Sequence, residues 1–229
     1  MPEIEMICLA NSRKRQGRCI AGLQTDGQGW IRPVAPGEEG TLYAGHLRLP
    51  GGGEPRLLDV IKVGCAGPQP RPHQPENWSV DGAPWQLVSR ESPCAWRQSS
   101  MFDTEIVPGP ALFGSASDRE NWESLQRVPA KASLALVAPE NLQWQIALSH
   151  NFVRQTRALF HLQGAFYNLS VTDPVWEQRL RHLPDGQHDL AASGVHADDL
   201  VRLTVSLSEP FNGYCYKLVA AVLVLPQNS

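Results

Sequence analysis

The chain has 229 residues, among them 19 glycines and 19 prolines, with 19% charged residues and a formal net charge of −3. So many helix breakers exclude a helical bundle, and the low charge with seven tryptophans argues against disorder. Proteins that coat duplex DNA are usually basic, so contact with nucleic acid would need a local basic patch. We therefore expect short strands joined by turns.

The cysteines and the chain ends bear on the cellular compartment. None of the five cysteines forms a C-x-x-C pair, which supports neither a disulfide framework nor a structural zinc site and fits a reducing cytoplasm. The N-terminus lacks the basic start and apolar run of a signal peptide. The longest apolar stretch, Leu218–Pro226, is too short to span a bilayer. We expect a cytoplasmic protein with no cofactor, no metal and no membrane contact.

The first half of the chain contains a series of short candidate strands. These are expected at residues 3–10, 18–23, 30–34 and 57–63, with Asp26-Gly27 as a hairpin turn. The next segment, about 66–116, is rich in proline and tryptophan, and we interpret it as an ordered insertion folded over the first domain rather than a linker. Ser117-Asp-Arg-Glu120 matches a capping box and predicts a short helix. We place the domain boundary near residue 130, giving domains 1–130 and 131–229.

The second half has a more regular pattern. A helix is expected at about 174–183, because Asp173 suits the N-cap and Pro174 the first helical position. The strands around it are expected at 132–137, 143–148, 157–162, 165–171, 200–206 and 214–225. The three strands directly before the helix, the helix and the two strands after it follow the order of an OB-fold, a five-stranded Greek-key barrel. The sequence thus predicts a mainly β protein with two OB-like small β-barrels, short helices and a long Pro/Trp-containing insertion.

Several stretches of the chain also carry a family resemblance. They are Cys8–Lys14, Gly17–Gly22, Trp30–Val34, His73–Trp78, Val171–Pro174 and Leu207–Ala220. Through them nearly the whole chain resembles the bacterial dual OB-containing domain family. That family implies two OB-like barrels in one chain, and OB-folds as a class favour oligonucleotides and oligosaccharides.

The first candidate site is a basic turn. Arg13, Lys14, Arg15 and Arg18 place four positive charges within six residues, in a loop that OB-folds commonly use for ligands. One strand further on, Trp30 and Arg32 share a face, and an aromatic ring beside a guanidinium can stack a base while the guanidinium holds a phosphate. Alternatively, the loop is a solvated edge that keeps the sheet soluble.

Two shorter motifs have alternative structural interpretations. In His73-Gln-Pro-Glu76-Asn77-Trp78 the polar groups could contact a ligand or ligate a metal, but Pro75 disfavours a helix and loop architecture explains them well. In Thr172-Asp173-Pro174 helix capping accounts for Asp173, although a catalytic aspartate is an alternative.

The fourth candidate is the start of the last strand. Tyr214 and Tyr216 share one face of it, while Cys215 and Lys217 share the other. The tyrosines could stack bases or sugar rings, or pack as the rim of the core. Cys215 could have a pKa lowered by the lysine or be a buried structural thiol.

The sequence carries no phosphate loop, dinucleotide fingerprint, H-E-x-x-H or G-x-S-x-G motif. The leading hypothesis is therefore a non-enzymatic module that binds single-stranded nucleic acid or a nucleotide-like ligand. A second is a protein-interaction adaptor in a bacterial defence or nucleic-acid-processing assembly, and a third is an enzyme using His73, Glu76, Asp173 or Cys215. The expected ligand-binding residues are Arg13, Lys14, Arg18, Trp30, Arg32, His73, Glu76, Asn77, Tyr214, Tyr216 and Lys217.

Overall fold

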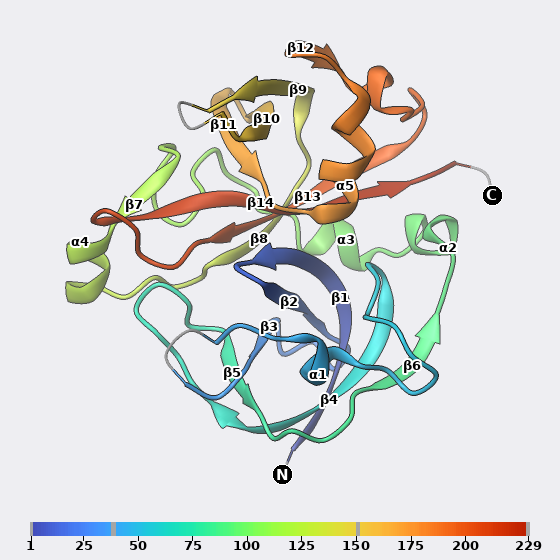
Figure 1. Ribbon diagram of the computed structural model, residues 1–229, viewed down its shortest axis with the longest axis vertical. Helices are drawn as coiled ribbons and strands as arrows, with labels where there is room; N and C mark the ends of the chain where they lie inside the picture. The colour runs from blue at the N-terminus through green and yellow to red at the C-terminus, as the bar shows by residue number, and fades with distance from the viewer. Residues whose placement is uncertain (1, 38–39, 150–151, 228–229) are drawn as a thin grey trace.

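The computed structural model describes residues 2–37, 40–149 and 152–227. Two β-sheets, each curled around its own core, lie one above the other (Figure 1). They meet where strand β1 (Glu3–Lys14) of the first sheet packs against β14 (Tyr214–Leu225) of the second.

The first sheet has the strand order β1-β2-β3-β5-β4-β6, and β1 also pairs with β4, so that β1 to β5 close into a barrel. Its remaining elements are β2 (Gly17–Gln24), β3 (Trp30–Val34), α1 (Ala44–Leu47), β4 (Asp59–Pro68), β5 (Asn77–Val80) and β6 (Gln86–Arg90). A parallel pairing of β3 with β5, with α1 between β3 and β4, gives this barrel the OB connectivity.

Closure of the first barrel depends on a close approach between β1 and β2. The β1–β2 register shifts between Cys8 and Ala10, which lets β1 bend and pair with β2 on one side and β4 on the other. Gly22 lies opposite Cys8, and a Cβ at this position would lie 2.0 Å from the carbonyl oxygen of Ile7. Only glycine fits there.

The second sheet repeats the arrangement in the order β12-β9-β10-β11-β14-β13-β8, with β7 paired to β14. Its strands are β7 (Arg119–Asn121), β8 (Leu134–Val137), β9 (Glu140–Leu148), β10 (Arg154–Leu162), β11 (Ala165–Val171), β12 (Gly186–Asp189) and β13 (Leu200–Leu207). Its helices are α5 (Pro174–Arg179), η1 (Leu180–His182) and η2 (Ala191–Ser193). β11 and β14 pair in parallel, as β3 and β5 do in the first barrel.

These observations confirm the mainly β architecture with two OB-like barrels, and the helix expected at about 174–183 is α5 followed by η1. The segment 66–116, interpreted as an ordered insertion over the first domain, contains the end of β4 at Pro68 and the strands β5 and β6, which belong to the first sheet. With four and five residues, these two strands are too short for alternation to reveal them.

The rest of that segment and its continuation link the two halves. It forms α2 (Pro93–Arg97) and α3 (Met101–Thr104), and then β7 and α4 (Trp122–Arg127) follow. The helix expected from Ser117 begins five residues later, because Asn121 supplies the cap by accepting from the backbone N–H of Ser124. Leu112 packs in the core of the second barrel. The domain boundary near residue 130 stays a prediction. Part of the chain before residue 130 already contacts the second barrel, as Leu112 does.

Each barrel has its own core, and a third apolar layer fills the space between them. Ile7 and Leu9 of β1 pack there with Leu136, Leu223 and Leu225 of the second barrel. The hydroxyl of Thr204 also donates to the carbonyl oxygen of Leu9 at 2.6 Å. The barrels are therefore joined by buried apolar surface, the main source of stability at such contacts.

Candidate ligand-binding site between the barrels

A buried cluster of hydrogen-bonded polar side chains forms a joint between the two barrels, with Arg32 at its centre. Arg32 on β3 is 0% exposed, and its guanidinium donates to the hydroxyls of Ser133 (3.0 Å) and Ser206 (2.9 Å) and, at 3.4 Å, to Oδ1 of Asn77. The Glu76 carboxylate accepts from the backbone N–H and hydroxyl of Ser133, both at 2.6 Å. Sequence reasoning assigned Arg32, Glu76 and Asn77 to a ligand. In the structure Arg32 and Glu76 bond to the second barrel, whereas Asn77 bonds to Arg32 and Gln74 within the first.

A second polar cluster forms around Glu209, in the loop between β13 and β14. One of its carboxylate oxygens accepts from Nζ of Lys14 at 2.8 Å, and the other lies 2.9 Å from Nε2 of His73 and 3.6 Å from the Arg71 guanidinium. Burial alone raises the pKa of Glu209, but hydrogen bonds with His73 and Lys14 outweigh it and lower the pKa to about 2. His73 is buried, and the polar atom of its ring that has a partner faces Glu209 of the second barrel.

The basic turn is the tip of the β1–β2 hairpin, which contacts the second barrel while Arg13, Arg15 and Gln16 are exposed to solvent. Arg13 and Arg18 are cross-strand neighbours, and each has an acidic partner: Arg13 pairs with Glu177 at 2.6 Å and Arg18 with Glu54 at 2.9 Å. The backbone N–H of Arg13 donates to the carbonyl oxygen of Thr172. These contacts tie the base of the turn to the second barrel, while Arg13 and Arg15 are exposed, so a ligand contact and a solvated sheet edge both stay predictions.

The expected stacking platform of Trp30 beside Arg32 does not form. Trp30 is half-buried and packs against the apolar layer between the barrels, while Arg32 is wholly buried. The alternation of β3 does direct both side chains toward the second barrel, as their spacing predicted. That barrel covers Arg32 wholly and Trp30 in part, so the two do not form one exposed platform.

An aromatic strip lies on the outer face of β14. Tyr214 and Tyr216 flank the guanidinium of Arg119, which lies 5.2 and 5.4 Å from their ring centroids. On the inner face, Nζ of Lys217 lies 3.0 Å from Glu120, and burial lowers its pKa. Burial raises the pKa of Cys215 to about 12. The predicted division of faces is correct. Lys217, however, is buried, and its ammonium group bonds to Glu120 and Ser115 of the segment before α4.

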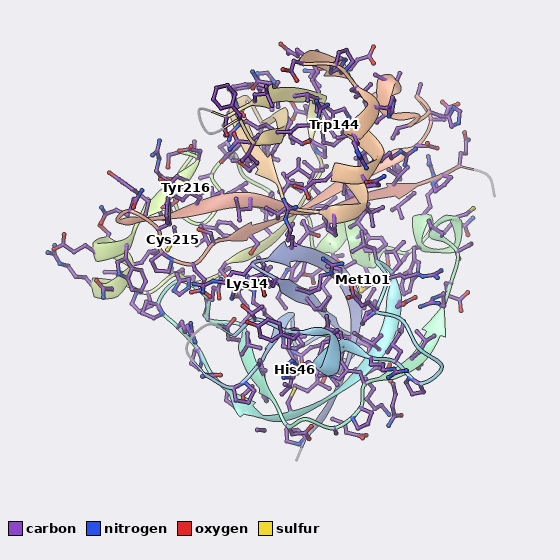
Figure 2. The ribbon with its side chains drawn as sticks, viewed as in Figure 1. Lys14, His46, Met101, Trp144, Cys215 and Tyr216 are labelled. Carbon is purple, nitrogen blue, oxygen red and sulfur yellow. The ribbon has the colours of Figure 1, made fainter. Side chains whose placement is uncertain are left out.

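The loop pocket is a cavity of about 380 Å³ bounded by the basic hairpin tip on one side and the β13–β14 loop on the other. Its lining combines three basic residues, Arg13, Lys14 and Arg15, with two aromatic ones, Phe211 and Tyr216. Figure 2 shows Lys14 at the junction of the barrels, with Tyr216 on the neighbouring strand β14. Sequence reasoning missed Phe211, which is 65% exposed at the tip of a loop that OB-folds use for ligands.

The candidate catalytic groups have structural partners. One Asp173 oxygen accepts from the backbone N–H groups of Val175 (2.9 Å) and Trp176 (3.2 Å), and the other from Val222 (3.1 Å). The capping interpretation of Asp173 is confirmed.

Within residues 2–37, 40–149 and 152–227, no three His, Cys, Asp or Glu side chains are grouped so as to hold a metal ion. No helix of that part of the chain is long and apolar enough to cross a membrane.

The architecture of two joined OB-like barrels can now be compared with known proteins. The profile of the dual OB-containing domain family matches residues 4–222. The chain belongs to this family. The resemblance carried by the sequence motifs is thereby confirmed over nearly the whole length of the two barrels.

Solved structures that match this chain include the tetrameric p202 HIN2 and a murine DNA-binding protein bound to double-stranded DNA. Both are 8% identical to this chain and cover 98% of it, over 92% and 99% of their own lengths, with TM-scores of 0.31 and 0.32. Comparison with curated proteins gives no match.

Proposed function

We propose that this protein is a non-enzymatic binding module for single-stranded nucleic acid or a nucleotide-like ligand, and that the loop pocket is its binding site. One observation carries the proposal: the hairpin tip and the β13–β14 loop bring three basic and two aromatic side chains to one cavity. Guanidinium and ammonium groups pair with phosphate, and aromatic rings stack on bases of any sequence.

Charge at the loop pocket favours an anion although the chain as a whole is acidic. Arg13, Lys14 and Arg15 contribute three positive charges to the lining, against one negative charge from Glu209 and one from Glu177, which pairs with Arg13, leaving an excess of one. Arg71 lies 3.6 Å from Glu209 on the outside of the pocket and adds one further positive charge. Local excess charge of this kind attracts phosphates even where the net charge is −3.

The strip of Tyr214, Arg119 and Tyr216 extends the site along β14. Tyr216 belongs both to the strip and to the pocket lining, so a strand whose phosphate lies in the pocket can place its next base on the strip. The pocket volume of about 380 Å³ accommodates one nucleotide rather than a duplex. This favours single strands.

The test is fluorescence anisotropy with a labelled oligothymidine at low salt. Phe211→Ala should weaken binding about tenfold, because a stacked base contributes roughly 1–3 kcal/mol. Arg13→Ala should weaken it and reduce its salt dependence, because one phosphate contact is lost. Lys62→Ala on β4, whose side chain lines a different pocket, is the matched control. Absence of binding, or binding that Phe211→Ala and Arg13→Ala leave unchanged, refutes the proposal.

A protein-interaction adaptor is the second candidate function. It is favoured by Leu148, Phe152 and Val153 beside the β9–β10 turn, of which Phe152 is 84% exposed. Exposed apolar groups that lie close together are typical of protein contacts. A partner that co-purifies with the wild-type chain and is lost with Phe152→Ser and Val153→Ser, but not with Phe211→Ala, would support this function; retention by the double variant would contradict it.

A further inference from the structure

We infer that the protein has a second ligand site, specific for a small organic anion with a flat apolar body. It is a cavity of about 510 Å³ on the side of the β1–β2 hairpin that faces α5, and we call it the α5 cleft. Figure 1 shows α5 on the face of the second barrel that lies toward β1. Its lining comes from β1, β2 and the 54–58 segment of the first barrel, and from α5 and β14 of the second.

The wall of the α5 cleft is apolar and held in place. Trp176 is 3% exposed, its Nε1 donates to the carbonyl oxygen of Val222 at 2.9 Å, and its ring lies 5.1 Å from that of Trp144. Leu57 lines the cleft from the first barrel and Val224 from the second. A mostly apolar lining with a few placed polar groups is typical of small-molecule sites, which often lie between domains.

The charged groups of the cleft leave one positive charge in excess. Arg18, Arg56 and Arg179 are offset by Glu54 and Asp173. Arg18 is paired with Glu54, and the Asp173 oxygens are occupied by backbone N–H groups. The guanidinium groups of Arg56 and Arg179 remain as candidates for pairing with a ligand anion.

These two arginines have different roles. Arg179 is fixed in place: it donates to the carbonyl oxygens of Ser193 (2.6 Å) and Gly194 (3.1 Å), and its guanidinium lies 4.9 Å from the centroid of the Trp176 ring. Arg56 is exposed. Its backbone N–H donates to Asp59 at 2.8 Å, but within the described ranges no acidic side chain pairs with its guanidinium. We therefore assign Arg56 as the group that pairs with the ligand's anion and Arg179 as part of the wall.

This chemistry selects a monoanion rather than a nucleic-acid strand. A single excess charge attracts one carboxylate or sulfonate, while Glu54 and Asp173 repel a second negative group. The apolar wall binds a ring or short acyl group, which a phosphodiester chain does not offer. The α5 cleft therefore differs from the loop pocket, where basic groups predominate, and the inference does not depend on the proposed function.

Calorimetric titration of the full chain with naphthalene-2-carboxylate, and with the neutral 2-naphthylmethanol as a charge control, tests the site. The carboxylate should bind about tenfold more tightly, because a charge-assisted hydrogen bond is added to the same apolar contact. Arg56→Ala should remove that difference while leaving the fold intact, since the side chain is exposed. Arg48→Ala, an exposed arginine after α1 that does not line the cleft, should retain it.

Either of two affinity results overturns the inference: equal affinity for the acid and the alcohol, or a preference for the acid that survives Arg56→Ala. A loss of carboxylate binding in Phe211→Ala also overturns it, because it would place the ligand in the loop pocket. Oligothymidine binding is measured on the same Arg56→Ala protein. An unchanged value shows that the α5 cleft and the loop pocket are separate, and a parallel loss contradicts the assignment.

Discussion

Arg32 provides the sharpest test of how the barrels are joined. Its two shortest hydrogen bonds, to the Ser133 and Ser206 hydroxyls at 3.0 and 2.9 Å, are made by a charged donor with 0% exposure. At about 1.5 kcal/mol for each such bond, Arg32→Met should lower the free energy of unfolding by about 3 kcal/mol. Arg32→Ala also leaves a cavity, which adds about 1–2 kcal/mol.

Urea unfolding followed by tryptophan fluorescence measures both variants. For a chain of this length, 3 kcal/mol corresponds to a fall in melting temperature of about 6–12 °C. Arg48→Ala, an exposed arginine on the first barrel, should change stability by less than about 0.5 kcal/mol. If Arg32→Met costs less than about 1 kcal/mol, the joint depends on filled space rather than on the hydrogen bonds of the guanidinium, and the reasoning is refuted.

Three further predictions concern single groups. The pKa of Glu209 is lowered from 4.5 to about 2. Its ionised carboxylate therefore stabilises the fold fully above pH 4.5, and this contribution is lost as the pH falls toward 2. Glu209→Gln should remove this part of the pH dependence of the urea midpoint. Asp173→Ala should cost about 2–4 kcal/mol in urea unfolding, because three backbone donors lose their acceptor, whereas the exposed Asp185→Ala should cost less than about 1 kcal/mol. Cys215, buried with a pKa of about 12, should resist iodoacetamide in the folded protein while the half-exposed Cys94 reacts, as judged by peptide mass spectrometry; fast labelling of Cys215 would contradict its burial.

Local pattern was sufficient for the elements whose determinants are close together in the chain. The hairpin of β1 and β2, the cap of α5 at Asp173 and the division of β14 into an inner and an outer face all follow from neighbouring residues. The strands β5 and β12 have four residues each, which is too few alternating positions to predict a strand from the sequence. They are strands because they pair with strands that are distant in the chain.

By itself, the sequence determined the architecture: turn residues, strand alternation and one strongly capped helix specify two OB-like barrels. It also identified many of the polar residues that matter. Only the tertiary structure decided what they do, because a polar side chain has the same signature whether its partner is a ligand or another part of the chain. Arg32 and Ser206, 174 positions apart, show this: their contact makes Arg32 a joint between barrels, while Phe211 becomes part of a pocket.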